Sequence, residues 1–245
     1  MIRFEGFTKE YGGHFAVRDL SFTVEPGEVV ALLGPNGSGK TTSLKAAAGL
    51  IRPTSGAVLV GSPPRPSSEP SARAALSFLP QKVSFPEALT GREVVEFYRR
   101  LRGVPADRTG EVLRFSCLNG ASSRPVGTYS GGMVQRLGLA VAALPQAPVL
   151  LLDEPTAALD PDGLRAFYGL VEARRRAGQA VLFTTHHLDD VEELADRFAL
   201  LVEGRLAAVM TAAELSTRLA AHGGGPGGKR MRLEGLYREL VGGGA

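Results

Sequence analysis

The sequence predicts an α/β fold with a mostly parallel sheet, and two observations carry this prediction. Short uninterrupted apolar runs at residues 29–33, 149–152 and 181–185 are typical of strands buried on both faces. Helical patterns at residues 40–50 and 162–176 lie between these runs, and a glycine-rich loop joins the first run to the first helix. Alternating buried strands and helices favour a parallel sheet covered by helices.

Other segments extend this core at both ends and in the middle. Strands are expected at residues 2–7, 20–24, 57–60 and 75–79, and the first of these suggest an N-terminal antiparallel β subdomain. A hairpin is expected at 198–209, turning at Glu203-Gly204. Residues 63–70 are rich in proline and serine and predict a loop. Helical spacing from residue 91 to 144 predicts an inserted α-helical subdomain over about residues 86–145.

Composition excludes several classes of protein. The chain has 245 residues, 44% of them apolar and 22% charged, which excludes wholesale disorder. Its single cysteine, Cys117, excludes a disulfide framework and a zinc site of several cysteines. The net charge of +3 is too small to indicate nucleic-acid binding. The most apolar stretch, residues 137–152, is interrupted by glycine, glutamine and two prolines, so no membrane span is expected.

The domain division expected from these patterns has three parts. Residues 1–222 form the main domain, and residues 223–228 are a glycine-rich linker. Residues 229–245 are expected to form a short helical tail. The N-terminus lacks the apolar core of a signal peptide, so we expect a soluble, cytosolic chain unless a partner holds it at a membrane.

The strongest chemical signal is the glycine-rich loop between the first buried run and the first helix. It reads Gly34, Pro35, Asn36, Gly37, Ser38, Gly39, Lys40, Thr41, Thr42. This matches the phosphate-binding pattern of a P-loop NTPase core, in which backbone N–H groups surround phosphate oxygens. Lys40 would reach the β- and γ-phosphates, and the Thr41 hydroxyl would ligate Mg²⁺. A chance glycine loop is the weaker alternative, because a strand precedes the loop and a helix follows it.

A second signal is a pair of carboxylates after the apolar run 149–152. Asp153 and Glu154 would stand at the C-terminal end of a strand, where α/β sheets place their ligands. Asp153 would belong to the Mg²⁺ shell, and Glu154 would act as general base on the attacking water. Taken alone, the pair could equally be an ordinary helix N-cap after a strand.

Residues 129–137 complete a resemblance to a known family. The run Tyr129-Ser130-Gly131-Gly132-Met133 lies 23 residues before Asp153, counted from Ser130. It resembles the signature motif of ATP-binding-cassette (ABC) ATPases. Six separate motif elements of this family occur in the chain, in the family's order. The resemblance extends from Phe4 to about Leu219. Met133 and Tyr129 depart from it, because many members have glutamine and leucine there.

The resemblance implies roles for four residues beside the phosphate loop. Tyr11 would stack on the adenine and Val17 would pack near the ribose. Gln81 would sense Mg²⁺ and the water while contacting the membrane partner, and His186 would contact the γ-phosphate. Read without the family, Tyr11 could cover a sheet edge, Gln81 could be a plain loop residue and His186 could be structural.

The resemblance also implies a second copy of the cassette. Ser130, Gly131 and Gly132 would bind the γ-phosphate held by the facing subunit, and Asp160 would lie in the loop that connects the two sites. Ser130 could instead simply cap a helix. The carboxylates Asp189, Asp190, Glu192 and Glu193 are expected to form a solvated helix face rather than a metal site.

The implied function is an ATPase subunit that drives a separate membrane permease, with ATP and Mg²⁺ as ligands. A homodimer is favoured over a heterodimer, at the cytoplasmic face of the membrane. Residues 78–98 resemble exporter-type cassettes and, weakly, copper-processing cassettes of nitrous oxide reductase maturation. The alternative is a soluble ABC ATPase acting on ribosomes or nucleic acid, but the chain lacks the second cassette, coiled coil or basic arm that usually accompanies that role.

Overall fold

The computed structural model describes residues 1–118, 120–186, 188–211, 213–214 and 217. The strands within this part of the chain form two sheets. Their bounds are β1 Ile2–Tyr11, β2 His14–Val24, β3 Val29–Leu33, β4 Ser55–Val60, β5 Arg65–Pro66, β6 Leu76–Leu79, β7 Val149–Asp153, β8 Ala180–Thr185, β9 Arg197–Val202 and β10 Arg205–Thr211. The helices are α1 Lys40–Ala47, α2 Pro70–Ala74, α3 Gly91–Leu101, α4 Asp107–Phe115, α5 Gly131–Ala143, α6 Pro161–Arg176 and α7 Leu188–Leu194, with a 3₁₀ turn, η1, at Val126–Thr128.

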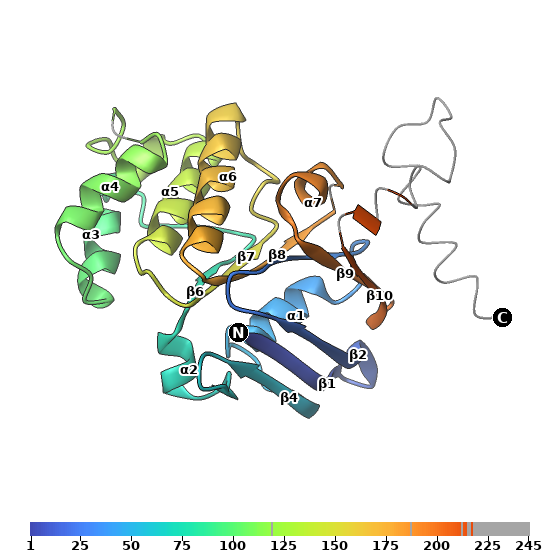
Figure 1. The fold of residues 1–245 in the computed structure, drawn as a ribbon. Helices are drawn as coiled ribbons and strands as arrows, with labels where there is room; N and C mark the ends of the chain where they lie inside the picture. Colours follow the sequence, from blue (N-terminus) through green and yellow to red (C-terminus); the bar gives the residue numbers. More distant parts are fainter. Residues whose placement is uncertain (119, 187, 212, 215–216, 218–245) are drawn as a thin grey trace.

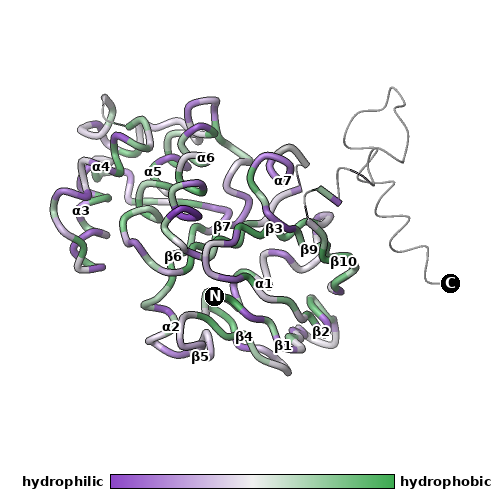
Figure 2. The backbone as a smooth tube through the Cα atoms, in the orientation of Figure 1, coloured by the Kyte–Doolittle hydropathy of each residue, from purple (hydrophilic) through white to green (hydrophobic). Residues whose placement is uncertain are grey.

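The central sheet confirms the predicted parallel core. Its strand order is β10-β9-β3-β8-β7-β6, and every neighbouring pair is parallel except β10 with β9. Successive side chains of a strand point to opposite faces, and here both faces are covered. Ala31 and Leu33 pack in the cluster under α5 and α6, whereas Val30 and Leu32 pack in the cluster with α1 and the second sheet. This explains the uninterrupted apolar run in β3, and Figure 2 shows the hydrophobic residues of these central strands.

The second sheet confirms the predicted antiparallel β subdomain. Its order is β2-β1-β4-β5, with antiparallel pairing throughout. Register shifts interrupt the β1–β2 pairing between Phe4 and Glu10. Ile2, Phe4 and Val24 point inward and are buried against α1 and the central sheet. In Figure 1 this sheet lies on the opposite side of the molecule from α3, α4 and α5.

The segment predicted to be helical, residues 91–144, contains α3, α4, η1 and α5. The three α-helices pack on one another and, through α5, on α6 and β6. The stretch expected to be a plain loop, residues 63–70, holds the two-residue strand β5, and α2 begins at Pro70. Both elements are short, and Ala72 of α2 is buried in the cluster beside the central sheet.

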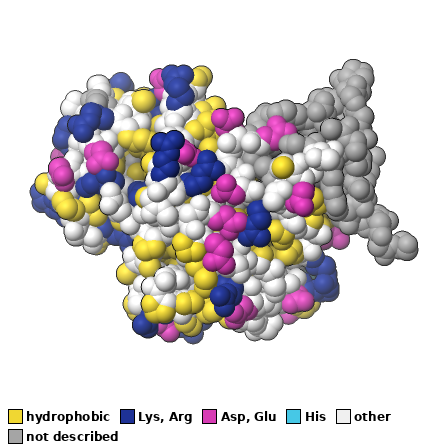
Figure 3. Space-filling model, in the orientation of Figure 1, with side chains coloured by type: hydrophobic (Ala, Val, Ile, Leu, Met, Phe, Trp, Pro, Cys, Tyr) yellow, Lys and Arg dark blue, Asp and Glu magenta, His cyan; other side chains and the backbone are white. Residues whose placement is uncertain are grey.

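No helix in the described residues is long and apolar enough to cross a membrane. The linker and helical tail expected at 223–228 and 229–245 lie outside the described residues. On the face shown in Figure 3, basic and acidic side chains are interspersed rather than gathered by sign.

Candidate functional site

The functional segments follow the carboxyl ends of four adjacent parallel strands. In the order β3, β8, β7, β6, these strands lead into the phosphate loop, His186, Glu154 and Gln81. This is the edge at which open α/β sheets bind ligands. A cavity of about 360 Å³ joins them, and its lining consists of Ala16, Asn36, Gly37, Gly39, Lys40, Thr41, Thr42, Gln81, Glu154 and His186. The structure therefore brings together residues that are far apart in the sequence.

Two glycines of the phosphate loop are required by the close packing around it. A Cβ on Gly34 would lie 2.3 Å from the carbonyl oxygen of Leu201, and a Cβ on Gly39 would lie 2.5 Å from that of Ala16. Gly39 also has a φ of 101°, a conformation that glycine adopts without strain. The loop then enters α1 at Lys40, so the amino end of this helix points at the cavity and favours an anion there.

Lys40 is held over the loop. Its ammonium group donates hydrogen bonds to the carbonyl oxygens of Gly34 at 2.8 Å and Pro35 at 3.1 Å. Burial lowers the pKa of Lys40 from its usual value, and the nearby carboxylates of Glu154 and Asp153 oppose that shift. The Glu154 Oε1 atom lies 3.9 Å from Lys40 Nζ. A buried cation beside a helix amino end suits the multiply charged phosphates of a nucleotide.

Asp153 has the surroundings of a cation ligand. Its Oδ1 atom accepts hydrogen bonds from the hydroxyls of Thr184 at 2.7 Å and Thr41 at 3.2 Å. Its Oδ2 atom is buried and finds no hydrogen-bond partner among the described residues. Burial raises the pKa of Asp153, although the two threonine hydrogen bonds oppose the shift. An unpartnered carboxylate oxygen beside a threonine hydroxyl fits a hard divalent cation such as Mg²⁺.

Glu154 stands at the centre of the polar cluster. Its Oε2 atom accepts a hydrogen bond of 2.9 Å from Gln81 Nε2, and its Oε1 atom lies 3.6 Å from His186 Nδ1. The residue has a φ of 46°, a left-handed conformation that is uncommon for residues other than glycine. The backbone N–H of Glu154 donates to the Thr184 hydroxyl at 2.8 Å, which anchors this conformation. The side chain is thereby held on the wall of the cavity, between Lys40, Gln81 and His186.

The two residues expected at the base and sugar differ from each other. Tyr11 is 50% exposed, as a stacking platform requires, and the Lys9 ammonium lies over its ring. Val17 is fully buried and touches the loop at Gly39, so its side chain is not on the cavity surface. The neighbouring Ala16 lines the cavity instead. Adjacent residues of β2 face opposite sides. The packing of Val17 near the ribose stays a prediction.

The signature residues lie outside this cavity. Ser130 is exposed and caps α5, where its Oγ accepts the N–H of Met133 at 3.3 Å. Asp160 caps α6 by accepting the N–H of Gly163 and forms an ion pair with Arg136. A Cβ on Gly132 would lie 3.1 Å from the Ala158 carbonyl oxygen, so the signature and the Asp160 loop are packed together. Ser130 thus does cap a helix, and neither Ser130 nor Asp160 lines the cavity at the phosphate loop of its own chain.

Asp190 was expected in a solvated helix face, and this is wrong. Its carboxylate is 4% exposed and accepts hydrogen bonds from the hydroxyls of Thr156 at 2.8 Å and Thr185 at 2.9 Å. It also accepts one from Tyr168 at 3.3 Å. Asp190 thus ties the segment between Glu154 and Asp160 to the end of β8, one residue before His186. The sequence shows only an acidic helix, and these partners come from distant segments.

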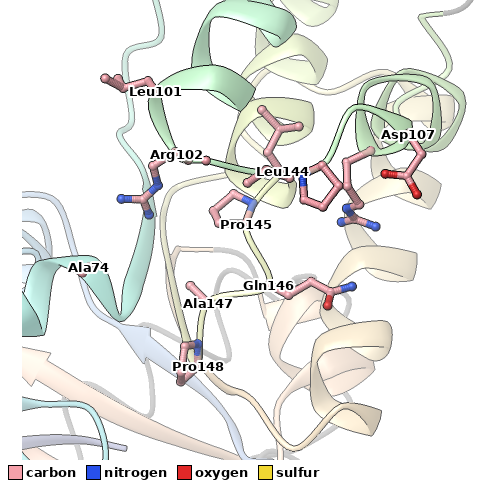
Figure 4. Close-up of a pocket in the computed structure, with 13 residues that line it drawn as sticks. Ala74, Leu101, Arg102, Asp107, Leu144, Pro145, Gln146, Ala147 and Pro148 are labelled. Atoms are coloured by element: carbon pink, nitrogen blue, oxygen red, sulfur yellow. The ribbon is translucent and has the colours of Figure 1, made fainter.

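A larger cavity of about 650 Å³ lies away from this cluster. It runs between the end of α3 and the segment that follows α5, and Figure 4 shows Leu101 and Arg102 on one side and residues 145–148 on the other. Its lining includes none of the phosphate loop, Glu154 or His186. We therefore place the functional site in the smaller cavity, which is lined by the phosphate loop, Glu154 and His186.

A family model named "ABC transporter" matches residues 17–157, more than half of the chain. The chain belongs to the ABC transporter ATP-binding family. It is an ATPase that converts ATP and water to ADP and phosphate, coupled to transport. Its α/β fold, with a mostly parallel central sheet and an antiparallel β subdomain, is the fold of this family's cassettes.

Similar proteins include both named transporter subunits and a solved cassette. The chain is 40% identical over 211 residues to the uncharacterized ABC transporter ATP-binding protein YxlF of Bacillus subtilis, covering 84% of this chain and 69% of that one. It is 37% identical over 219 residues to the doxorubicin resistance ATP-binding protein DrrA of Mycobacterium tuberculosis, covering 87% and 66%. The chain thus spans about two thirds of the length of these relatives. The dimeric post-hydrolysis structure of the ATP-binding cassette MJ0796 with ADP and Pi matches with a TM-score of 0.78 and 25% identity, covering 86% and 99%.

Proposed function

We propose that this ABC ATPase energises an exporter-type permease and works as a dimer of cassettes. The observation that carries the proposal is the separation of the two halves of the site within one chain. Lys40, Asp153 and Glu154 converge on one cavity, whereas Ser130 is exposed at the amino end of α5 elsewhere. A second copy is required to bring a signature to the phosphate loop. The solved cassette MJ0796, which is similar to this chain, is a dimer.

The residues would divide the work on the triphosphate as follows. Lys40 and the N–H groups of the loop would hold the phosphates, and Asp153 with Thr41 would hold Mg²⁺. Bound there, Mg²⁺ would neutralise charge on the phosphate oxygens. Gln81 would orient Glu154, to which it is hydrogen-bonded. His186, 3.6 Å from Glu154, would contact the γ-phosphate.

The chemical step transfers the γ-phosphoryl group to water. The water oxygen forms a bond to the γ-phosphorus as the bond to the ADP oxygen breaks, and the proton of the water passes to Glu154. The closed dimer would be stabilised by ATP because Ser130 and Gly132 of one copy contact the γ-phosphate held by the other. Loss of that phosphate removes the contact, so hydrolysis shifts the equilibrium to the open pair. Identical copies would make two equivalent sites, since every residue named here is present in this chain.

The α3 helix offers a surface for the permease. Phe97 and Leu101, one helical turn apart, are 58% and 68% exposed. Both lie on the helix that follows the Gln81 segment, so a partner bound to α3 would also sense the state of Glu154 through Gln81. Exposed aromatic and aliphatic side chains at helical spacing are typical of a docking face. Such a partner would place the chain at the cytoplasmic face of the membrane. The export direction rests on the likeness to the doxorubicin resistance subunit.

Replacing Phe97 and Leu101 together with glutamate should release the permease without loss of basal ATPase activity. Two charges on the docking face would have to lose water on binding, which costs several kcal/mol. The test is affinity purification of the chain from detergent-solubilised membranes of its source, with quantification of the co-purifying polytopic membrane protein. Leu50→Glu, at an equally exposed leucine after α1, is the matched control.

We expect at least a tenfold loss of the membrane protein with the α3 variant and none with Leu50→Glu. Undiminished recovery with the α3 variant would disprove this docking face. Recovery of ribosomes or nucleic acid in place of a membrane protein would favour the alternative function, a soluble ABC ATPase that acts on ribosomes or nucleic acid.

A further inference from the structure

Tyr129 makes a specific contact that a leucine could not make. It lies between η1 and Ser130, the residue that caps α5. Its phenol donates a hydrogen bond of 2.8 Å to the carbonyl oxygen of Ala121, and its ring packs against the core cluster beneath the helices. Burial raises the pKa of the phenol, so it remains a neutral hydrogen-bond donor at neutral pH. The residue immediately before the signature serine is therefore held both by the hydrogen bond of its hydroxyl and by the packing of its ring.

Gly91, the first residue of α3, makes room for this phenol. A Cβ there would lie 2.3 Å from the Tyr129 hydroxyl oxygen and 3.2 Å from its Cζ atom. The φ of Gly91 is outside the left-handed region, so its backbone conformation does not require glycine. The helix start itself is conventional, with Thr90 and Glu93 forming a capping box. The absence of a side chain at position 91 is thus explained by the tyrosine.

Backbone hydrogen bonds join the same two segments over their length. The N–H of Gly127 donates to the Glu87 carbonyl at 3.0 Å, and that of Val126 donates to Leu89 at 2.8 Å. In the other direction, the N–H of Arg92 donates to Ser122 at 2.8 Å. The segment that leads from Gln81 into α3 is therefore bonded to the segment that leads into the signature.

We propose that the contact of Tyr129 with Gly91 positions Ser130 relative to α3, and so sets how well the signature engages the ATP of a second cassette. Tyr129 touches no phosphate and is a positioning residue. A cassette with an alanine at position 91 would have to displace the phenol and break its bond to Ala121. The Ser130 hydroxyl would then lose its fixed distance from α3. This inference rests on the proposed dimer.

The test is a double-mutant cycle over Gly91→Ala and Tyr129→Leu, with ATP hydrolysis and ATP-dependent dimerisation as readouts. Gly91→Ala alone should raise KM for ATP and weaken dimerisation by roughly fivefold to tenfold, with kcat at saturating ATP within about twofold of wild type. Adding Tyr129→Leu to Gly91→Ala removes the steric conflict. The KM for ATP and the strength of dimerisation of the double variant should therefore equal those of Tyr129→Leu alone. ATP affinity of the monomer should not change in any variant, because the phosphate loop is untouched.

Gly169→Ala is the matched control, since a Cβ in this helix would meet only the Phe115 ring at 3.9 Å. We expect it to behave as wild type. Additive effects in the cycle, or a fall in kcat and melting temperature with unchanged KM, would overturn the positioning role. If wild type itself neither hydrolyses ATP nor dimerises, the proposed function fails, whatever the cycle shows.

Discussion

Glu154→Gln is expected to slow ATP hydrolysis by at least about 100-fold while ATP binding is retained. The carboxylate is 11% exposed, accepts the Gln81 amide at 2.9 Å and lies among residues that line the cavity. Glutamine has the same shape, so contacts with the triphosphate persist. Its amide oxygen cannot take the proton of the attacking water, and the general-base contribution is lost. Steady-state phosphate release and ATP titration of the purified protein measure the two quantities separately.

Glu203→Gln provides an unusually close control for this variant. Glu203 is the same residue type, is exposed and has a φ of 49°, close to the 46° of Glu154. Any effect of the amide on a left-handed backbone should therefore appear in both variants. Hydrolysis at the wild-type rate in Glu154→Gln would remove Glu154 from the role of base.

Lys40→Ala is expected to weaken ATP binding by about 100-fold or more. Lys40 is 5% exposed, and burial already lowers its pKa, so its charge is maintained by nearby carboxylates and would be stabilised further by phosphates. Hydrogen bonds between a charged donor and a phosphate are worth about 1.5–3 kcal/mol each, and tenfold in affinity corresponds to about 1.4 kcal/mol. Isothermal titration with ATP and Mg²⁺ measures the loss directly.

Lys45→Ala is the control for Lys40, because Lys45 is on the same helix and is exposed. It should bind ATP as wild type does. Lys40→Arg should bind weakly as well, since a planar guanidinium does not fit the place of the compact ammonium between the Gly34 and Pro35 carbonyls. Wild-type affinity in Lys40→Ala would show that the nucleotide binds elsewhere.

The core strands could be predicted from the sequence because a strand buried on both faces has an uninterrupted run of apolar residues. The runs at 29–33, 149–152 and 181–185 became β3, β7 and β8, and β8 also takes in Ala180. The same reasoning failed at residues 63–70, where proline and serine predict a loop but the chain forms β5 and begins α2 at Pro70. Those elements are too short for a periodic pattern, and contacts with β4 and β6 stabilise them.

Some of the site residues could likewise be placed from the sequence, and others could be placed only from the fold. The phosphate loop, Gln81, Glu154 and His186 line one cavity because each follows the end of a parallel strand, which sequence spacing reveals. Val17 is buried whereas Ala16 lines the cavity, and this difference could not be read from the sequence because register shifts interrupt the β1–β2 pair. Asp190 looks like its acidic neighbours, and only the fold brings Thr156 and Thr185 to it. The fit between Tyr129 and Gly91 likewise depends on a contact across 38 positions of the chain.

The central claim is that one copy supplies the phosphate loop and another supplies Ser130. Sedimentation equilibrium of Glu154→Gln with ATP and Mg²⁺ tests it most directly, alongside the double variant Ser130→Arg/Glu154→Gln. We expect Glu154→Gln to be a dimer with ATP and a monomer with ADP. The double variant should bind ATP and remain a monomer, because the arginine would block the contact with the facing γ-phosphate. A monomer in the first case, or an ATP-dependent dimer in the second, would contradict the composite site.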